Sequence, residues 1–122
     1  MDQVAVVILN WNGEEMLRRF LPGVLRYTKG RVYVADNASS DGSVAMLSRD
    51  FPTVDIILLD RNYGFADGYN RALEQIEAEY YVLLNSDVEV KDDWLAPMIR
   101  YMEMHPDVAA CQPKIRSWHV PE

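Results

Sequence analysis

The sequence predicts an α/β fold, a Rossmann-like three-layer sandwich in which helices cover both faces of a mostly parallel sheet. Two observations support this prediction. Short runs of apolar residues alternate with segments whose apolar residues recur at helical spacing. Each apolar run also ends abruptly in a polar turn, as strands do where open α/β sheets bind ligands. The alternation continues without an internal repeat, so we expect residues 1–122 to form a single domain.

Four apolar runs predict the strands. Val4–Leu9 and Tyr80–Leu84 are too apolar to be half-exposed, so we expect both to be buried on both faces. Arg31–Ala35 and Val54–Leu59 are shorter runs that predict two further strands. Val108–Cys111 is expected to add a fifth strand at an edge.

Four segments with helical spacing of apolar residues predict the helices. They begin at Glu14, after the Ala38–Gly42 turn, at Phe65 and at Asp92–Asp93, and the last two end at Glu77 and at His105–Pro106. Pro22 is expected to kink the first helix or to split it in two, because proline removes a helical hydrogen bond.

Polar residues follow each predicted strand, and the carboxyl ends of parallel strands meet at one edge of the sheet. These residues are Asn10, Asp36, Asn62 and the turn from Asn85 to Asp87. Asp87 is either an acid that faces a metal ion or phosphate in a D-x-D-like turn, or an ordinary loop carboxylate. Asp36 either hydrogen-bonds the ribose or base of a nucleotide or shapes a turn with Asn37.

The other two turns carry residues of a kind that contacts nucleotides. Trp11 either stacks on a base or covers the end of the sheet. Gly64 and Gly68 either let the backbone approach a diphosphate at the start of a helix or belong to a plain glycine-containing loop.

Composition excludes several classes of protein. With 19 acidic against 12 basic residues the net charge is −7, which disfavours a nucleic-acid partner. No apolar stretch is long enough for a transmembrane segment, and Cys111, as the only cysteine, forms no disulfide within the chain. Neither G-x-G-x-x-G nor G-x-x-x-x-G-K-[ST] occurs, which disfavours NAD enzymes and P-loop NTPases.

Four stretches occur in a specific order: VAVVILNWNGEEMLRRFLPGVL from Val4, VYVADNASSDGS from Val32, NYGFADGYNRAL from Asn62 and YYVLLNSDVEV from Tyr80. Together they resemble the successive signatures of glycosyltransferase family 2, particularly its rhamnosyltransferase-like branch. The resemblance covers nearly the whole chain. It implies a GT-A fold and the inverting, metal-dependent transfer of a sugar from a nucleotide-sugar donor, UDP- or dTDP-linked, to an acceptor.

The resemblance also implies roles for individual residues. Leu9 and Trp11 would lie beside the nucleobase, and Asp36 would bond its ring. Asn62 and Gly64 would face the nucleotide. Asn85, Ser86 and Asp87 match the D-x-D element, with asparagine in place of the first aspartate, so that Asp87 would be the ligand of a Mg or Mn ion.

Family members continue for roughly another domain's length, and the resemblance places the acceptor site and the catalytic base there. No acid of this chain matches the base, so we expect the base to lie beyond Glu122 and the donor-binding half to be inactive alone. The acceptor would be a glycan or lipid-linked molecule, such as a growing cell-surface polysaccharide. A cytoplasmic location is expected, with any peripheral attachment to the inner face of the membrane coming from regions outside this chain.

Two other classes of protein share this architecture. A non-catalytic nucleotide-binding or interaction module would keep the fold and lack the downstream acid. A sugar nucleotidyltransferase would need a glycine-rich first turn bearing arginine and lysine, which the Asn10–Gly13 turn lacks.

Overall fold

The computed structural model describes residues 4–92 and 94–105. Strands and helices alternate along these residues. In chain order they are β1 (Val4–Asn10), α1 (Glu14–Tyr27), β2 (Arg31–Asp36), α2 (Ser43–Asp50), β3 (Asp55–Leu58), α3 (Phe65–Leu73), β4 (Tyr80–Asn85) and α4 (Ala96–Met104). None of the helices in the described part of the chain is long and apolar enough to cross a membrane.

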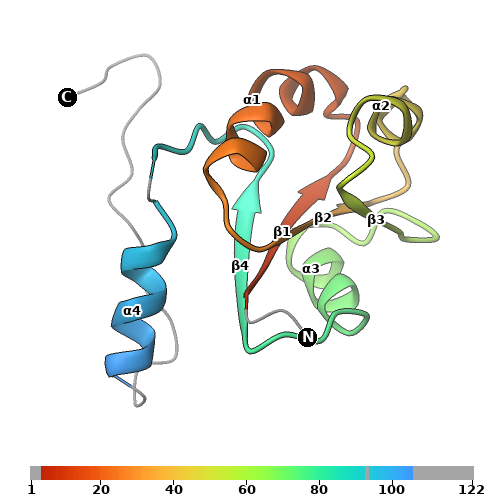
Figure 1. Cartoon of the computed structure of the whole chain (residues 1–122). Coiled ribbons are helices and arrows are strands. Elements are labelled where there is room, and N and C mark those ends of the chain that lie inside the picture. Colours follow the sequence, from red (N-terminus) through yellow and green to blue (C-terminus); the bar gives the residue numbers. More distant parts are fainter. Residues whose placement is uncertain (1–3, 93, 106–122) are drawn as a thin grey trace.

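The strands form one parallel sheet in the order β3-β2-β1-β4. The helices α1 and α2 lie on one face of this sheet and α3 lies on the other, so the molecule has three layers (Figure 1). This arrangement confirms the predicted α/β sandwich. Because β1 pairs with β2 on one side and β4 on the other, it is the central strand, as its apolar sequence predicts.

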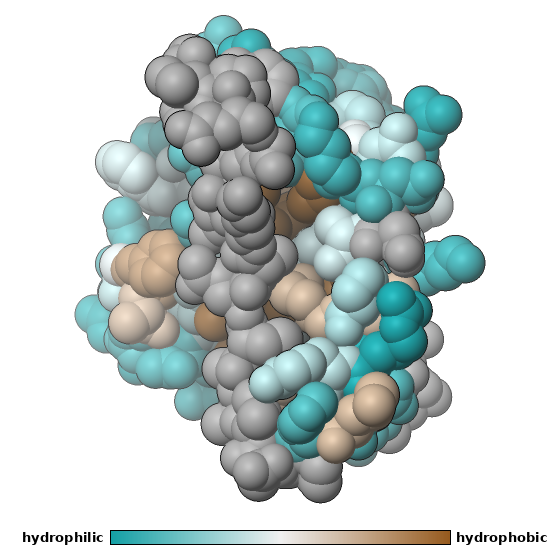
Figure 2. Space-filling model, turned by 90° about the vertical axis from the view of Figure 1, so that its left-hand side faces the viewer, coloured by the Kyte–Doolittle hydropathy of each residue, from teal (hydrophilic) through white to brown (hydrophobic). Residues whose placement is uncertain are grey.

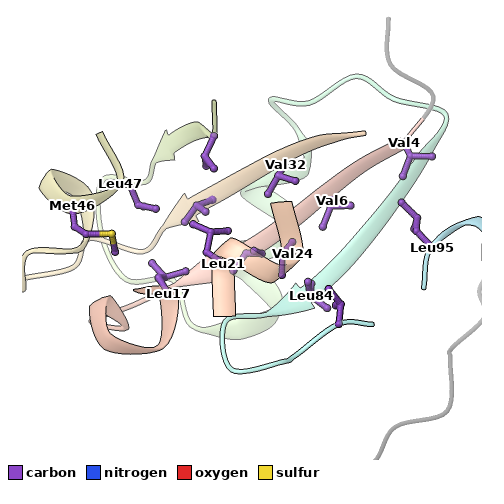
Figure 3. Packing of buried hydrophobic residues seen from close by; sticks show 14 residues of the cluster. Val4, Val6, Leu17, Leu21, Val24, Val32, Met46, Leu47, Leu84 and Leu95 are labelled. Atoms are coloured by element: carbon purple, nitrogen blue, oxygen red, sulfur yellow. The ribbon is translucent and has the colours of Figure 1, made fainter. Parts of the chain in front are cut away.

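Side chains of β1 alternate between the two faces of the sheet and hold both helical layers. Val4, Val6 and Ile8 pack with α1 and α2, whereas Ala5 and Val7 pack with α3. Figure 3 shows the larger of the two cores, in which leucines of α1 point at the valines of the strands. Its buried members include Leu17, Leu21, Val24, Val32, Val34, Met46, Leu47 and Leu84.

Helix α1 runs through Pro22 as one element, so of the two predicted effects of this proline, a kink or a division into two helices, the division is wrong. Leu21 and Val24, on either side of the proline, are buried in the large core, and Pro22 itself is exposed. Packing of these neighbours against the sheet therefore holds the helix together where proline removes a backbone hydrogen bond.

The prediction that β4 is buried on both faces is wrong for one face. Tyr81 is 41% exposed and Leu83 is 51% exposed, whereas Leu84, which points to the α1 side, is buried. The reason is topological, because α3 packs on β1 and β2 and β4 is an edge strand among the described residues. Figure 2, seen from the side on which α4 lies, shows apolar side chains on this side of the molecule.

Helix α4 begins at Ala96, a few residues after the predicted start at Asp92–Asp93. A proline in the first turn, Pro97, fits this start because the first helical N–H groups need no partner within the helix. The helix ends before His105 as predicted. The predicted fifth strand, Val108–Cys111, lies outside the described residues.

Candidate functional site

A pocket of about 570 Å³ lies at the carboxyl edge of the sheet. All the polar turns after the strands contribute to it, and the helix starts that follow two of them add apolar side chains. The lining residues are Leu9, Trp11, Gly13, Met16, Asn37, Asn62, Gly64, Phe65, Asn85, Ser86 and Asp87. The predicted convergence of the strand ends on one site is therefore present.

Among the residues to which the family resemblance gives a role, Asp36 alone does not line this pocket. It is 3% exposed, and its Oδ1 accepts hydrogen bonds from Asn10 Nδ2 at 2.9 Å and from Ser39 Oγ at 2.7 Å. Its Oδ2 accepts a third from the backbone N–H of Ser39 at 2.9 Å. The carboxylate is thus buried and held by three hydrogen bonds from the protein, and its contact with a nucleotide stays a prediction.

Asn37 was predicted only as a turn partner of Asp36, but it lines the pocket. Its Nδ2 donates to the carbonyl oxygen of Gly64 at 2.9 Å, and its Oδ1 accepts from the backbone N–H of Tyr63 at 3.0 Å. The turn after β2 is therefore tied to the turn after β3. Alternation along the strand is the signal that separates the two residues, since neighbouring side chains point in opposite directions.

The turn before α3 depends on two glycines. Gly64 has φ of 81°, a conformation that residues with a side chain rarely adopt, and its N–H donates to Asn62 Oδ1 at 2.8 Å. At Gly68 a Cβ would lie 3.0 Å from Asn37 Nδ2 and 3.1 Å from Leu9 Cδ1. Both glycines let the amino end of α3 approach the pocket, where a helix favours an anion.

The turn after β4 brings acceptor oxygens to the opposite side of the central strand. Asn85 is the register partner of Leu9 on β1, and Ser86 and Asp87 follow it at the pocket. Asp87 is exposed and makes no hydrogen bond or ion pair with any described residue. Its carboxylate is free to bind a cation.

The described residues contain no group of three or more histidine, cysteine, aspartate or glutamate side chains that could hold a metal ion. A single carboxylate with neighbouring hydroxyl and amide oxygens does suit a hard divalent cation when substrate phosphates supply the remaining ligands. The donor set thus fits a cation that arrives with a diphosphate rather than one bound by the protein alone.

Apolar side chains stand around the mouth of the pocket. Trp11 is 56% exposed and Phe65 is 64% exposed, and Met16 is also exposed. Phe65 packs edge-on against Tyr69, with the ring centroids 5.0 Å apart. Met16 and Phe65 were missed from the sequence, where Met16 is one of the apolar residues at helical spacing and Phe65 is the first residue of a predicted helix. Large exposed apolar groups grouped at one opening are typical of a ligand site.

The sequence matches the family described as glycosyl transferase family 2 over residues 5–122. The chain belongs to glycosyltransferase family 2. The family predicted from the four sequence signatures is confirmed, whereas the rhamnosyltransferase-like branch stays a prediction.

Among curated relatives, the poly-β-1,6-N-acetyl-D-glucosamine synthase of Staphylococcus epidermidis is 25% identical to this family 2 chain over 126 aligned residues. The alignment covers 96% of this chain and 30% of the synthase. This chain therefore spans about a third or less of the length of the curated relatives that it matches.

Solved structures of similar proteins share the fold. Staphylococcus aureus TarS (residues 1–349), in complex with UDP-GlcNAc, superposes with a TM-score of 0.72 at 21% identity, covering 85% of this chain and 32% of TarS. The mannosyltransferase PcManGT of Pyrobaculum calidifontis, in complex with GDP-Man and Mn²⁺, gives 0.74 at 22% identity, covering 83% and 32%. The expected GT-A type fold of family 2 is confirmed by these likenesses.

Proposed function

We propose that the pocket binds the nucleoside diphosphate of a nucleotide-sugar and that this chain is the donor-binding part of an inverting, metal-dependent glycosyltransferase. One observation carries the proposal: the turns after all the described strands contribute to a single pocket, which includes every residue given a role by the family resemblance except Asp36. The alternative, a module that binds nucleotides without catalysis, would use the same pocket.

The nucleobase lies against the turn after β1. Trp11 offers an exposed indole on which a planar base stacks, and Leu9 offers an apolar contact beside it. Asn37 supplies an amide at the same pocket. The donor is UDP- or dTDP-linked, as TarS supports by its complex with UDP-GlcNAc.

The diphosphate lies between α3 and the turn after β4. The amino end of α3, beginning at Phe65 after Gly64, offers a positive helix dipole, and Asp87 offers a carboxylate for the cation that accompanies the phosphates. A bound Mg or Mn ion would offset the negative charge that develops on the departing nucleoside diphosphate. The complex of PcManGT with GDP-Man and Mn²⁺ supports this choice of ion.

The sugar is transferred when an acceptor hydroxyl attacks the anomeric carbon and the bond to the diphosphate breaks. A base outside this chain takes the proton of the hydroxyl. The acceptor is a glycan or lipid-linked molecule, such as a growing cell-surface polysaccharide, which the relationship to a poly-N-acetylglucosamine synthase supports.

Calorimetric titration with UDP and with dTDP, each with and without Mn²⁺, tests the proposal. We expect binding that requires the metal ion in the wild-type chain and is lost in Asp87→Ala. Asp92→Ala is the matched control, because Asp92 is also exposed and lies outside the pocket lining. Binding that does not need Mn²⁺, or that survives Asp87→Ala, would contradict the role of Asp87.

A further inference from the structure

Asn10, Asp36 and Ser39 form a buried network at the ends of β1 and β2. Asn10 and Asp36 are register partners in the parallel pair, and neither lines the pocket. Asn10 Nδ2 donates both to Asp36 Oδ1 at 2.9 Å and to Ser39 Oγ at 3.2 Å. Asn10 is completely buried and Asp36 nearly so, which makes these bonds costly to break.

The network also holds the loop that carries Trp11. Asn10 Oδ1 accepts a hydrogen bond from the backbone N–H of Gly13 at 3.1 Å. Ser39 Oγ accepts another from the backbone N–H of Asn12 at 2.8 Å. Two consecutive N–H groups of the loop thus end on the network, which fixes the place of Trp11 and Gly13 in the wall of the pocket.

Asp36 is 3% exposed and does not line the pocket, so a base could reach its carboxylate only if the loop residues bonded to this network moved away. A buried donor would then lose its charged partner, and the Trp11 loop would lose its support. The contacts therefore favour an indirect role for Asp36.

We propose that Asn10 and Asp36 are positioning residues of the nucleotide site, which hold the Trp11–Gly13 loop in place and do not touch the ligand. This inference rests on the proposed nucleotide binding. It assigns Asn10 a function and gives Asp36 a role other than contact with the base.

The network offers a test by exchange of the two side chains. In the double variant Asn10→Asp/Asp36→Asn, the new amide donates to the new carboxylate, and the Ser39 hydroxyl reverses its direction to complete the set. The single variant Asn10→Asp sets two carboxylates against each other, and Asp36→Asn leaves donors facing donors. Only the double variant keeps both the hydrogen bonds and the net charge.

Affinities of each variant for UDP, dTDP and CDP in the presence of Mn²⁺ provide the measurement. We expect the affinity of each single variant to fall about tenfold or more, because a hydrogen bond to a charged group is disrupted. The factor should be the same for all three nucleotides. The double variant should return to within about threefold of wild type, because the exchange restores that hydrogen bond.

Direct contact predicts a different result. Uracil presents an N–H donor where cytosine presents an acceptor, so Asp36→Asn would weaken UDP binding and strengthen CDP binding, and the exchange would restore nothing. Either outcome would overturn the inference. So would a double variant that does not fold, as judged by urea unfolding, because the exchange would then not conserve the network.

Two further proteins complete the design. Ser39→Ala removes the half-buried hydroxyl that joins the two strands to the loop. This variant should lower the affinity for all three nucleotides by the same factor. Asn70→Asp, on the exposed side of α3, controls for the added charge of Asn10→Asp and should leave affinity unchanged. If the wild-type chain binds no nucleoside diphosphate, both the proposed function and this inference are overturned. If the wild-type chain binds nucleotides but the double variant does not regain affinity, only this inference is overturned.

Discussion

Asp41 Oδ2 accepts a hydrogen bond from the backbone N–H of Glu14 at 3.2 Å, while Glu14 Oε1 accepts one from the backbone N–H of Gly42 at 3.2 Å. Each acid thus serves the amino end of the other acid's helix, since Glu14 begins α1 and Asp41 shortly precedes α2. The N-cap positions themselves are glycines, Gly13 and Gly42, which offer no side-chain cap. The exchange joins the two helices beside the loops that form the pocket.

Asp41 makes the stability of the chain sensitive to acid. Burial opposes ionisation, but hydrogen bonds from Ser43 and from the Glu14 backbone outweigh it and lower the pKa of Asp41 below its ordinary 3.8. A lowered pKa in the folded state contributes stability above the unfolded value, and this contribution is lost as pH falls through the folded value. We therefore expect Asp41→Asn to be less stable than wild type near neutral pH.

Urea unfolding of both proteins from pH 7 down to pH 3 measures the effect. The difference in unfolding free energy should hold constant above about pH 5 and shrink below about pH 4, as the unfolded carboxylate takes up its proton. A difference that widened toward low pH would contradict the assignment.

Gly13→Ala and Gly23→Ala should change stability in opposite directions. At Gly13 a Cβ would lie 2.6 Å from Asn10 Oδ1, which belongs to a fully buried side chain held by hydrogen bonds, so we expect a loss of about 1–3 kcal/mol. At Gly23, inside α1, a Cβ meets nothing within 4 Å, so alanine should add about 0.5–1 kcal/mol. The urea midpoints of the two variants measure the direction of each stability change. Destabilisation by Gly23→Ala as well would contradict the open space expected around its Cβ.

Tyr69→Phe should destabilise the chain by about 1 kcal/mol, because the hydroxyl donates to the carbonyl oxygen of Leu84 at 3.0 Å in a buried setting. That hydrogen bond joins α3 to the edge strand β4. Tyr33→Phe is the control, since the Tyr33 hydroxyl makes no hydrogen bond with the described residues. Thermal unfolding of the two variants compares them, and equal midpoints would argue against the contribution of the Tyr69 hydroxyl.

Trp11→Ala should weaken nucleotide binding and leave stability nearly unchanged. The indole is largely exposed at the pocket, and loss of aromatic stacking on a base costs about 1–3 kcal/mol of binding. Trp94→Ala should do the reverse, because Trp94 packs against the large core and its Nε1 donates to Thr28 Oγ1 at 3.1 Å. Calorimetry measures the affinity of both variants, and urea unfolding measures their stability. Full affinity in Trp11→Ala would show that the indole does not contribute to nucleotide binding.

Periodicity and apolar runs predict the elements well because those patterns follow directly from burial. All the strands in the described residues begin and end within a residue of the apolar runs. What the sequence does not contain is the position of each strand in the sheet. Tyr80–Leu84 and Val4–Leu9 look alike as sequences, yet among the described strands β1 is central and β4 lies at the edge, so only topology explains why Leu83 is exposed.

The candidate site shows the same division between local and long-range information. The location of Asp87 follows from its place directly after a strand. The position of the Asp36 side chain depends on Asn10, its partner on the neighbouring strand, which donates a hydrogen bond to the Asp36 carboxylate. The predicted start of a helix at Phe65 likewise does not reveal that this side chain lies at the opening of a pocket, because other segments form the rest of the opening.

The strand order has a consequence during synthesis on the ribosome. β1 pairs with β2 soon after both have emerged, but its other edge waits for β4, which leaves the ribosome only after β3 and α3. At roughly 5–20 residues per second this interval lasts several seconds. For that time the apolar strand β1 has one unpaired edge, and an unpaired strand edge is the kind of surface through which incompletely folded chains associate.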